Sequence, residues 1–291
     1  MTTAIEILPA ASRSESPNAR LLRRTFRSPS AVVGLAILVV LVLASLGAQW
    51  LTSLDPNAIN PSQTLLAPGG AHPMGTDNIG RDIWARFLYG GRLSLLVGVI
   101  AISIGATAGI AIGAVAGYFG GWVDSALSWA MDVLISFPDL LLALAMIAVL
   151  GPGLINSMIA VGIAFVPGFA RLTRSSVLEI RERNYVEAAR ALGASDLSIL
   201  LTHLLPNALR PLLVLTTLGI GSAILTGAAL SFLGLGAQPP TPEWGAMLNA
   251  GQKFVRQGWW LTVFPGLGIF LTILSLNLLG DALSDAAAGG K

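Results

Sequence analysis

The side chains of this chain that could do chemistry do not form the pattern of a catalytic or metal-binding site. The 291 residues include no cysteine, which excludes disulfides, thiolate ligands and cysteine nucleophiles. The two histidines, His72 and His203, lie far apart in the sequence, whereas a metal site needs clustered ligands. No serine lies in a nucleophile-elbow pattern, and neither Lys253 nor Lys291 lies in a P-loop. We therefore predict no catalytic residue, no metal and no cofactor bound by this chain.

Residues 185–207 form one of the few polar stretches and lie between two long apolar segments. Opposite charges four residues apart, Glu179 with Arg183 and Arg183 with Glu187, predict a solvated helix over 175–192. Gly193 suits the left-handed position that ends a helix, and Ser195 is a good N-cap for the next one. The stretch is therefore expected to form a helix, a glycine corner and a second helix.

The second helix is predicted to carry an apolar stripe. Leu197, Leu200, Leu201 and Leu204 recur at the spacing of one helical face, and Pro206 is expected to close the helix. The small side chains of Ala188 and Ala189 would let another surface approach closely. We predict that a protein docks here. The alternative is that Glu187 is only half of a surface ion pair with Arg183 or Arg190, which would contribute little.

A second group of polar residues lies within an apolar run. Asp132 and Asp139 are seven residues apart, so one straight helix would place them on the same face. Asp139 follows Phe137-Pro138, where a break frees backbone groups that need partners. Ionisable residues inside membranes are functional candidates by default. We expect Asp139, with Phe137 and Pro138, to lie on a translocation pathway or against a partner helix; Asp132 could instead lie at the cytoplasmic end.

Composition shows what kind of elements must position these residues. The chain is 54% hydrophobic and 11% charged, with a mean hydropathy of +0.75, whereas soluble domains carry about 25% charged residues. The net charge of +2 is too small to indicate nucleic acid as a partner. The first thirty residues are polar and arginine-rich, without the pattern of a cleavable signal. These features predict an integral membrane protein that crosses the lipid bilayer several times.

Uncharged or nearly uncharged runs of about 20 residues predict an all-α fold with six transmembrane helices. The predicted spans cover residues 31–51, 93–119, 125–150, 154–170, 211–233 and 261–280, the third being broken at Phe137-Pro138. The predicted organisation is a cytoplasmic N-terminal segment (1–30), a first helix with an extracytoplasmic loop (31–92), and a core (93–285) that contains a cytoplasmic loop (171–210).

The basic residues orient the six spans. Arg20, Arg23, Arg24 and Arg27 precede the first span, which places the N-terminus in the cytoplasm. Six crossings return the C-terminus to the same side, and 12 of the 17 lysines and arginines then lie inside. The asymmetry predicts that loop 171–210 faces the cytoplasm.

Two further patterns concern packing. Four glycines in the second span recur every fourth residue, a spacing that lets a neighbouring helix approach one face closely. They are Gly105, Gly109, Gly113 and Gly117, and we expect static packing rather than a sliding surface. Residues 77–88 predict a short amphipathic helix, with Asp82 and Arg86 as an ion pair. It is expected to lie on the outer membrane surface as a brace or, alternatively, to contact a binding protein.

The polar stretch resembles the signature loop of ABC importer permeases. The matching residues are Glu187-Ala188-Ala189, then Gly193, then Leu205-Pro206. In that family the short helix after the glycine is the coupling helix, which fits a groove on the cytoplasmic ATPase. The family pattern has Ile ten residues after the glycine, where this chain has His203.

Further motifs resemble a narrower group, the C-type permease subunit of oligopeptide, dipeptide and nickel importers, and most closely the oligopeptide subunit. The similarity covers roughly residues 20–285 in the expected order. The motifs that carry it lie at 72–82 (HPMGTDNIGRD), 91–95 (GRLSL), 137–138 (FP), 230–236 (LSFLGLG), 239–245 (PPTPEWG) and 277–281 (NLLGD).

The resemblance implies a type I ABC importer fold in a prokaryotic inner membrane. It implies a homologous B-type permease, one or two ATPase subunits or a fused ATPase that bind the ATP and Mg²⁺, and an extracytoplasmic substrate-binding protein. It also implies that Glu243, Trp244 and Trp259 contact that protein or form an outer gate. Peptides are the expected substrate, and the amino group of a peptide could reach Asp139.

Two alternatives remain at this point. Nickel, or another small solute, could replace peptides as the substrate. A stand-alone secondary transporter or channel would need no ATPase and would usually carry internal repeats, which the sequence does not show convincingly.

Overall fold

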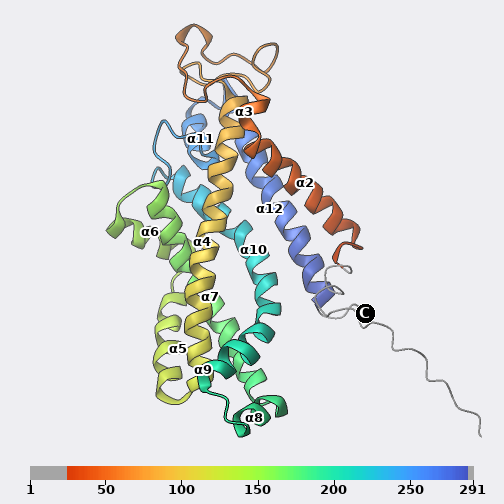
Figure 1. The fold of residues 1–291 in the computed structure, drawn as a ribbon. Helices are drawn as coiled ribbons and strands as arrows, with labels where there is room; N and C mark the ends of the chain where they lie inside the picture. Colours follow the sequence, from red (N-terminus) through yellow and green to blue (C-terminus); the bar gives the residue numbers. More distant parts are fainter. Residues whose placement is uncertain (1–24, 288–291) are drawn as a thin grey trace, which may run out of the picture.

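The computed structural model describes residues 25–287, which form a bundle of helices with no strand beyond two isolated bridges (Figure 1). Most of the predicted N-terminal segment, including Arg20, Arg23 and Arg24, lies outside the described residues, as does Lys291. The long helices are α2 (Pro29–Leu46), α4 (Ile83–Phe119), α5 (Gly121–Ile135), α6 (Asp139–Leu150), α7 (Leu154–Arg181), α10 (Leu205–Phe232) and α12 (Trp260–Ala287). The short ones are α3 (Ala48–Leu51), α8 (Asn184–Ala191), α9 (Asp196–Ile199) and α11 (Trp244–Gly251).

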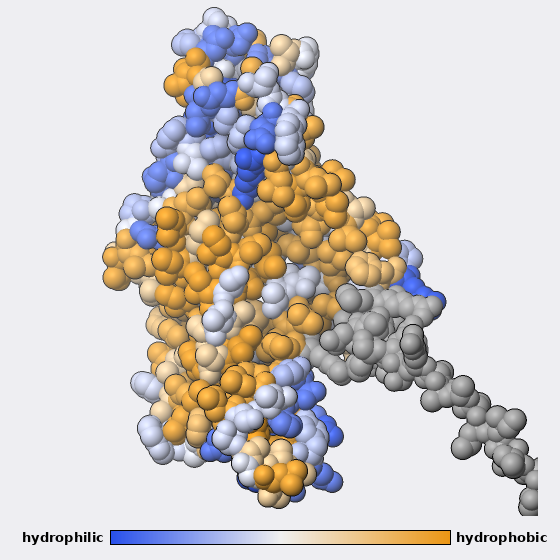
Figure 2. Space-filling model, viewed as in Figure 1, coloured by the Kyte–Doolittle hydropathy of each residue, from blue (hydrophilic) through white to orange (hydrophobic). Residues whose placement is uncertain are grey.

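The spans agree with the six that the sequence predicts. Five helices are long and apolar enough to cross a membrane, and α5 with α6 gives a sixth if this bent pair is one span. An apolar band covers the middle of the molecule between two polar ends (Figure 2). We call residues 52–82 with α11 the loop end, and α8 with α9 the α8 end; they lie at opposite ends of the bundle (Figure 1).

The predicted surface helix over 77–88 is wrong. Residues 77–82 form a turn in which the Asp77 carboxylate accepts hydrogen bonds from the Ile79 and Arg81 amides at 3.0 and 2.9 Å. Asp82 then caps α4 by accepting from the Ala85 amide at 2.7 Å, and the helix runs on without a break to Phe119. The ion pair between Asp82 and Arg86 is not formed, because Asp82 also pairs with His72 at 2.7 Å.

Arg86 and Arg92 attach α4 to the loop end. The Arg86 guanidinium is buried and donates to the Pro56 and Pro240 carbonyls at 2.9 and 3.3 Å. Arg92 donates to the carbonyls of Ser45 and Leu46, at 2.6 and 2.7 Å, in the last turn of α2. A cation near a helix C-terminus is favourable because unpaired carbonyls gather there. Arg86, which was predicted to pair with Asp82, and Arg92, for which no role was predicted, therefore hold the loop end and α2 to α4.

The four repeated glycines lie where α4 packs against α7. A Cβ atom at Gly105 would lie 2.9 Å from the Gly162 carbonyl oxygen, and one at Gly117 would lie 2.9 Å from the Arg174 carbonyl oxygen. At Gly109 and Gly113 an added Cβ atom would lie even closer to α7, 2.5 Å from Phe169 Cβ and 2.2 Å from the Ala170 carbonyl oxygen. All four are buried. The absence of side chains lets the two helix backbones approach closely along the length of this contact.

The third span is sharply bent. The axes of α5 and α6 differ by 94° across Ser136–Pro138. Because of this bend, Asp132 and Asp139 do not share a helical face, and that prediction is wrong. A proline at 138 cannot donate the amide that a continuous helix would need, so α6 restarts at Asp139.

Candidate functional site

The α8 end forms from two short helices joined by a glycine corner. Helix α7 ends at Arg181 and α8 begins at Asn184, so the single helix predicted over 175–192 is interrupted. Gly193 has a φ of +83°, a conformation in which L side chains are strained, and its amide donates to the Arg190 carbonyl. The Ser195 hydroxyl accepts from the Ser198 amide at 3.4 Å and begins α9. The predicted corner and N-cap are present.

Helix α9 does not end at Pro206. A π-helical turn, Leu200–Leu204, joins it directly to α10 (Leu205–Phe232). Pro206 lies in the first turn of α10, where a missing amide is tolerated because the first helical amides have no partner within the helix. The prediction that this proline closes the short helix is therefore wrong.

The leucine stripe divides between two faces. Leu204 is fully buried with Ile199, and Leu200 is half-buried against the same cluster. Leu197 and Leu201 instead point outward, with 65% and 53% of their surface exposed. Leu192, beside Gly193, is 89% exposed. We call Leu192, Leu197 and Leu201 the leucine face; the sequence analysis missed Leu192, although it directly precedes the corner.

The other predicted coupling residues of the loop are mostly exposed. Glu187, Ala188, Gly193 and Pro206 are exposed, and Ala189 is half-buried. Arg183 pairs with Glu179 at 2.9 Å rather than with Glu187, because the break between α7 and α8 changes the helical phase. The alternative for Glu187, an ion pair with Arg183 or Arg190, is therefore not formed among the described residues.

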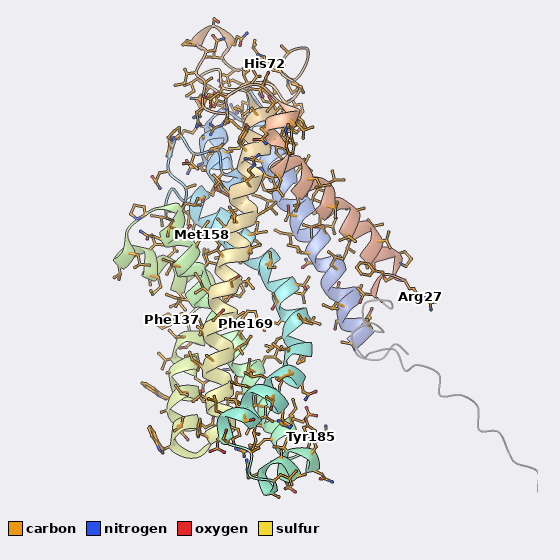
Figure 3. All side chains as sticks on the ribbon, viewed as in Figure 1. Arg27, His72, Phe137, Met158, Phe169 and Tyr185 are labelled. Carbon is orange, nitrogen blue, oxygen red and sulfur yellow. The ribbon has the colours of Figure 1, made fainter. Side chains whose placement is uncertain are left out.

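A buried cluster holds α8 and α9 to the bundle. Val177 of α7, Val186 of α8 and Ile199 of α9 are each fully buried, and the Tyr118 ring of α4 packs with them. The Tyr118 hydroxyl donates to the Asp196 carboxylate at the start of α9. His203 stacks on Tyr185, with ring centroids 6.4 Å apart, and so lies beside α8 rather than in the cluster. Figure 3 shows Tyr185 at this end of the molecule.

The residues predicted for the pathway lie at the bend between α5 and α6. Phe137 is 52% exposed, and Pro138 and Asp139 are also exposed. Asp139 occupies the first turn of α6, where the helix dipole favours a carboxylate. In Figure 3, Phe137 lies near the edge of the bundle and Phe169 within it. Phe137, Pro138 and Asp139 therefore lie together on an exposed surface of this chain.

Two ion pairs between α5 and α7 were not predicted. Arg174 forms two hydrogen bonds with Asp124, and the one from Nη2 to Oδ2 is 2.6 Å long. Arg171 pairs with Asp132 at 2.8 Å, and both side chains are more than half exposed. A cavity of about 380 Å³ lies beside them, lined also by Ser128 of α5. Asp132 therefore has a partner on α7, which its spacing from Asp139 did not reveal.

The residues predicted to contact a binding protein or form an outer gate include both buried and exposed side chains. Trp244 is fully buried, and its Nε1 donates to the Phe87 carbonyl at 3.0 Å. Glu243 is 1% exposed and accepts from the Ser94 hydroxyl at 2.9 Å and from two amides of α11. Neither side chain therefore offers a surface for direct contact in this structure, and a role of Glu243 and Trp244 in an outer gate stays a prediction, whereas Trp259 is 52% exposed.

Two known protein families together match most of this chain. Residues 109–288 match the family described as binding-protein-dependent transport system inner membrane component. Residues 16–68 match the N-terminal TM domain of oligopeptide transport permease C.

Curated relatives are similar over nearly their whole length. The dipeptide transport system permease protein DppC of Alkalihalophilus pseudofirmus is 44% identical over 93% of this chain and 89% of its own. The probable D,D-dipeptide transport system permease protein DdpC of Escherichia coli is 43% identical over 91% of this chain and 90% of its own. The glutathione transport system permease protein GsiD of Pectobacterium atrosepticum is 42% identical over 91% of this chain and 88% of its own.

A solved structure matches the fold. A chain of the MetNI methionine ABC transporter, in an inward-facing conformation, has a TM-score of 0.55 at 20% identity. The match covers 69% of this chain and 95% of that one.

Proposed function

Since the chain belongs to the binding-protein-dependent transport system inner membrane components, as a C-type permease of ABC importers, we propose that it forms half of a peptide pathway driven by cytoplasmic ATPases. The proposed point of coupling is the α8 end. The observation that carries this proposal is the leucine face, three exposed leucines on short helices whose other side is fixed in a buried cluster.

The chemistry of the leucine face suits a protein partner. Leu192, Leu197 and Leu201 present exposed apolar side chains at the α8 end, between α7 and α10. Exposed apolar patches rimmed by polar residues mark interaction sites. Glu187 and Arg190 are exposed charged residues on the adjoining helix α8, and the small side chain of Ala188 leaves room for close approach. The bound ATP and Mg²⁺ belong to the partner ATPase in this proposal.

The charge pattern supports an orientation for this permease. The arginines of α7, α8 and the adjoining turns gather at the α8 end, which supports the proposal that this end and both termini face the cytoplasm of a prokaryotic cell. The loop end then faces the extracytoplasmic substrate-binding protein, and half-exposed Trp259 is available there. A homologous B-type permease would complete the pathway on the open side of α5 and α6.

Small peptides are the proposed substrate. This choice rests on the relatives, whose names give dipeptide, D,D-dipeptide and glutathione transport, and all three are short peptides or peptide-like molecules. Uptake of labelled dipeptide, competed by unlabelled peptides of increasing length and by nickel, tests it. Uptake of nickel without uptake of the labelled dipeptide would favour the nickel alternative.

Docking at the leucine face is tested by charge substitution. Leu197→Asp and Leu201→Asp are expected to lower the amount of ATPase that copurifies with the permease by about tenfold, because a buried carboxylate would have no partner at the interface. Uptake should fall in parallel. Both side chains are exposed in this chain, so the variants should still reach the membrane in normal amounts.

The matched control is Leu54→Asp at the loop end. Leu54 is 42% exposed, and the same substitution there should leave copurification of the ATPase unchanged. Normal ATPase binding and uptake by Leu201→Asp would refute docking at this face.

A further inference from the structure

One helix reaches both functional ends of the bundle. Helix α4 (Ile83–Phe119) has 37 residues, which makes it about 55 Å long at 1.5 Å per residue. It runs from the loop end, beside α11, to the α8 end, beside α9 (Figure 1). No proline interrupts it, and its glycines hold it against the backbone of α7. A displacement applied at one end of such a helix is therefore carried to the other.

At the α8 end, α4 is fastened to α9 by a side-chain contact. The Tyr118 hydroxyl donates to the carboxylate of Asp196, the first residue of α9, although the two residues are 78 apart in the sequence. The Tyr118 ring is 7% exposed and packs in the cluster with Ile199. Arg181 of α7 also holds the last turn of α4, because it donates to the carbonyls of Gly117 and Tyr118 at 3.2 and 3.0 Å. Movement of α9 is thereby linked directly to the last turn of α4.

At the loop end, α4 is fastened to α11 in a comparable way. The buried Ser94 hydroxyl donates to Glu243 at 2.9 Å and accepts from the Trp244 amide at 3.1 Å. Glu243 also accepts from the first amides of α11, so Ser94 joins α4 to the N-terminus of that helix. Trp244 stacks on Phe87 of α4, with ring centroids 5.3 Å apart. Nothing in the proposed docking of an ATPase requires these loop-end contacts.

We propose that α4 is a connecting rod between the ATPase-docking unit and α11, with Tyr118 and Ser94 as the positioning residues at its two ends. The inference rests on the proposed function, because the ATPase must move α9 for the rod to act. Movement of α9 pulls on α4 through Tyr118 and Asp196. The same displacement reaches α11 through Ser94 and Glu243, so ATP hydrolysis is coupled to a change at the opposite side of the membrane.

The experiment measures ATP hydrolysis and uptake of a labelled dipeptide in liposomes that contain the whole complex and its binding protein. Tyr118→Phe keeps the packed ring and removes only the hydroxyl, so the complex should assemble and hydrolyse ATP. Peptide taken up per ATP hydrolysed should fall about five- to tenfold, the lower part of the range typical of a coupling between two sites. Ser94→Ala should lower the same ratio, although Ser94 lies far from the ATPase.

Two variants on the same helix serve as controls. Ser103→Ala also removes a serine hydroxyl from α4, but that hydroxyl donates only to the Val99 carbonyl of its own helix. Tyr89→Phe removes a tyrosine hydroxyl and keeps the ring that Arg92 covers. Both should retain the normal ratio of uptake to hydrolysis.

The outcomes separate this inference from the proposed function. If no ATPase copurifies with the wild-type permease, the proposed function fails. If the ATPase binds and Tyr118→Phe keeps the normal uptake per ATP, only the connecting rod is refuted. Equal losses of hydrolysis and uptake, or loss of the complex in Tyr118→Phe, would assign the hydroxyl to folding and would also overturn the inference.

Discussion

At Gly109, the smallest possible side chain would already overlap the neighbouring helix. A Cβ atom there would lie 2.6 Å from the Val166 carbonyl oxygen and 2.5 Å from Phe169 Cβ. Backbone atoms cannot rotate away as a flexible side chain can. The contact between α4 and α7 therefore depends on single residues, and it lies between the two ends that α4 connects.

Gly109→Ala should lower the stability of the purified protein by about 1–3 kcal/mol, the usual cost of overpacking a well-packed core. Thermal unfolding in detergent measures the effect as a lower Tm. The matched control is Gly168→Ala on α7, where an added Cβ would meet no atom within 4 Å. Because alanine is the better helix former, that variant should be as stable as the wild type or slightly more stable. An unchanged Tm for Gly109→Ala would show that the two helices have room to separate.

At the scale of elements, α5 is held to α7 by two ion pairs of unequal environment. Arg174 and Asp124 have side chains that are 35% and 17% exposed. Arg171 and Asp132 are 59% and 63% exposed, and exposed pairs contribute little because water screens them. The attachment of α5 should therefore depend mainly on the pair nearer the start of the helix.

Asp124→Asn is expected to lower Tm by about 2–4 °C, which corresponds to a loss of roughly 1 kcal/mol in a protein of this size. Asp132→Asn should change Tm by less than about 1 °C, because its pair is screened. Thermal unfolding of both variants in the same detergent tests the order. A larger loss for Asp132→Asn would mean that its pair with Arg171 is covered by protein in solution.

Elements with a strong local signal could be predicted from the sequence, and those set by distant contacts could not. The glycine corner at Gly193 and the N-cap at Ser195 follow from local backbone chemistry. The split of the leucine stripe does not, because Leu204 and Ile199 are buried in a cluster that includes Val177 and Tyr118 from distant helices. Similarly, the pattern of residues 77–88 could not reveal that Asp82 caps a long helix, since that depends on the turn formed by Asp77 and Arg81.

The site residues follow the same rule. The resemblance to importer permeases implies that Glu243 and Trp244 contact a binding protein or form an outer gate, but it does not indicate whether their side chains are exposed. They are buried because Ser94 and Phe87, about 150 residues earlier in the chain, provide their partners. Such pairings join distant parts of the sequence and leave no periodic pattern.

At the scale of the whole molecule, family membership decides between the classes of function that the sequence left open. The match over residues 109–288, with relatives above 40% identity over nine-tenths of the chain, identifies an importer permease and not a stand-alone transporter. The fold match to a methionine importer chain leaves about a third of this chain unmatched. The oligopeptide-permease N-terminal match, residues 16–68, includes α2 and part of the loop end.

The absence of cysteine makes the predicted orientation directly testable. Ser53→Cys lies on the loop end and Ala191→Cys on α8, and both positions are exposed. A membrane-impermeant maleimide should label Ser53→Cys in intact cells that lack an outer-membrane barrier. It should label Ala191→Cys only after the inner membrane is opened. The wild-type chain, which cannot react, gives the background. The reverse labelling pattern would invert the topology.

The π-helical turn at Leu200–Leu204 has an evolutionary consequence. A π-helical turn holds one residue more than the α-helix around it, so loss of one codon there would restore regular winding. Each residue of an α-helix turns the chain by roughly 100°. A descendant lineage could therefore rotate the leucine face relative to α10, and so fit an ATPase with a differently shaped surface, without interrupting α10.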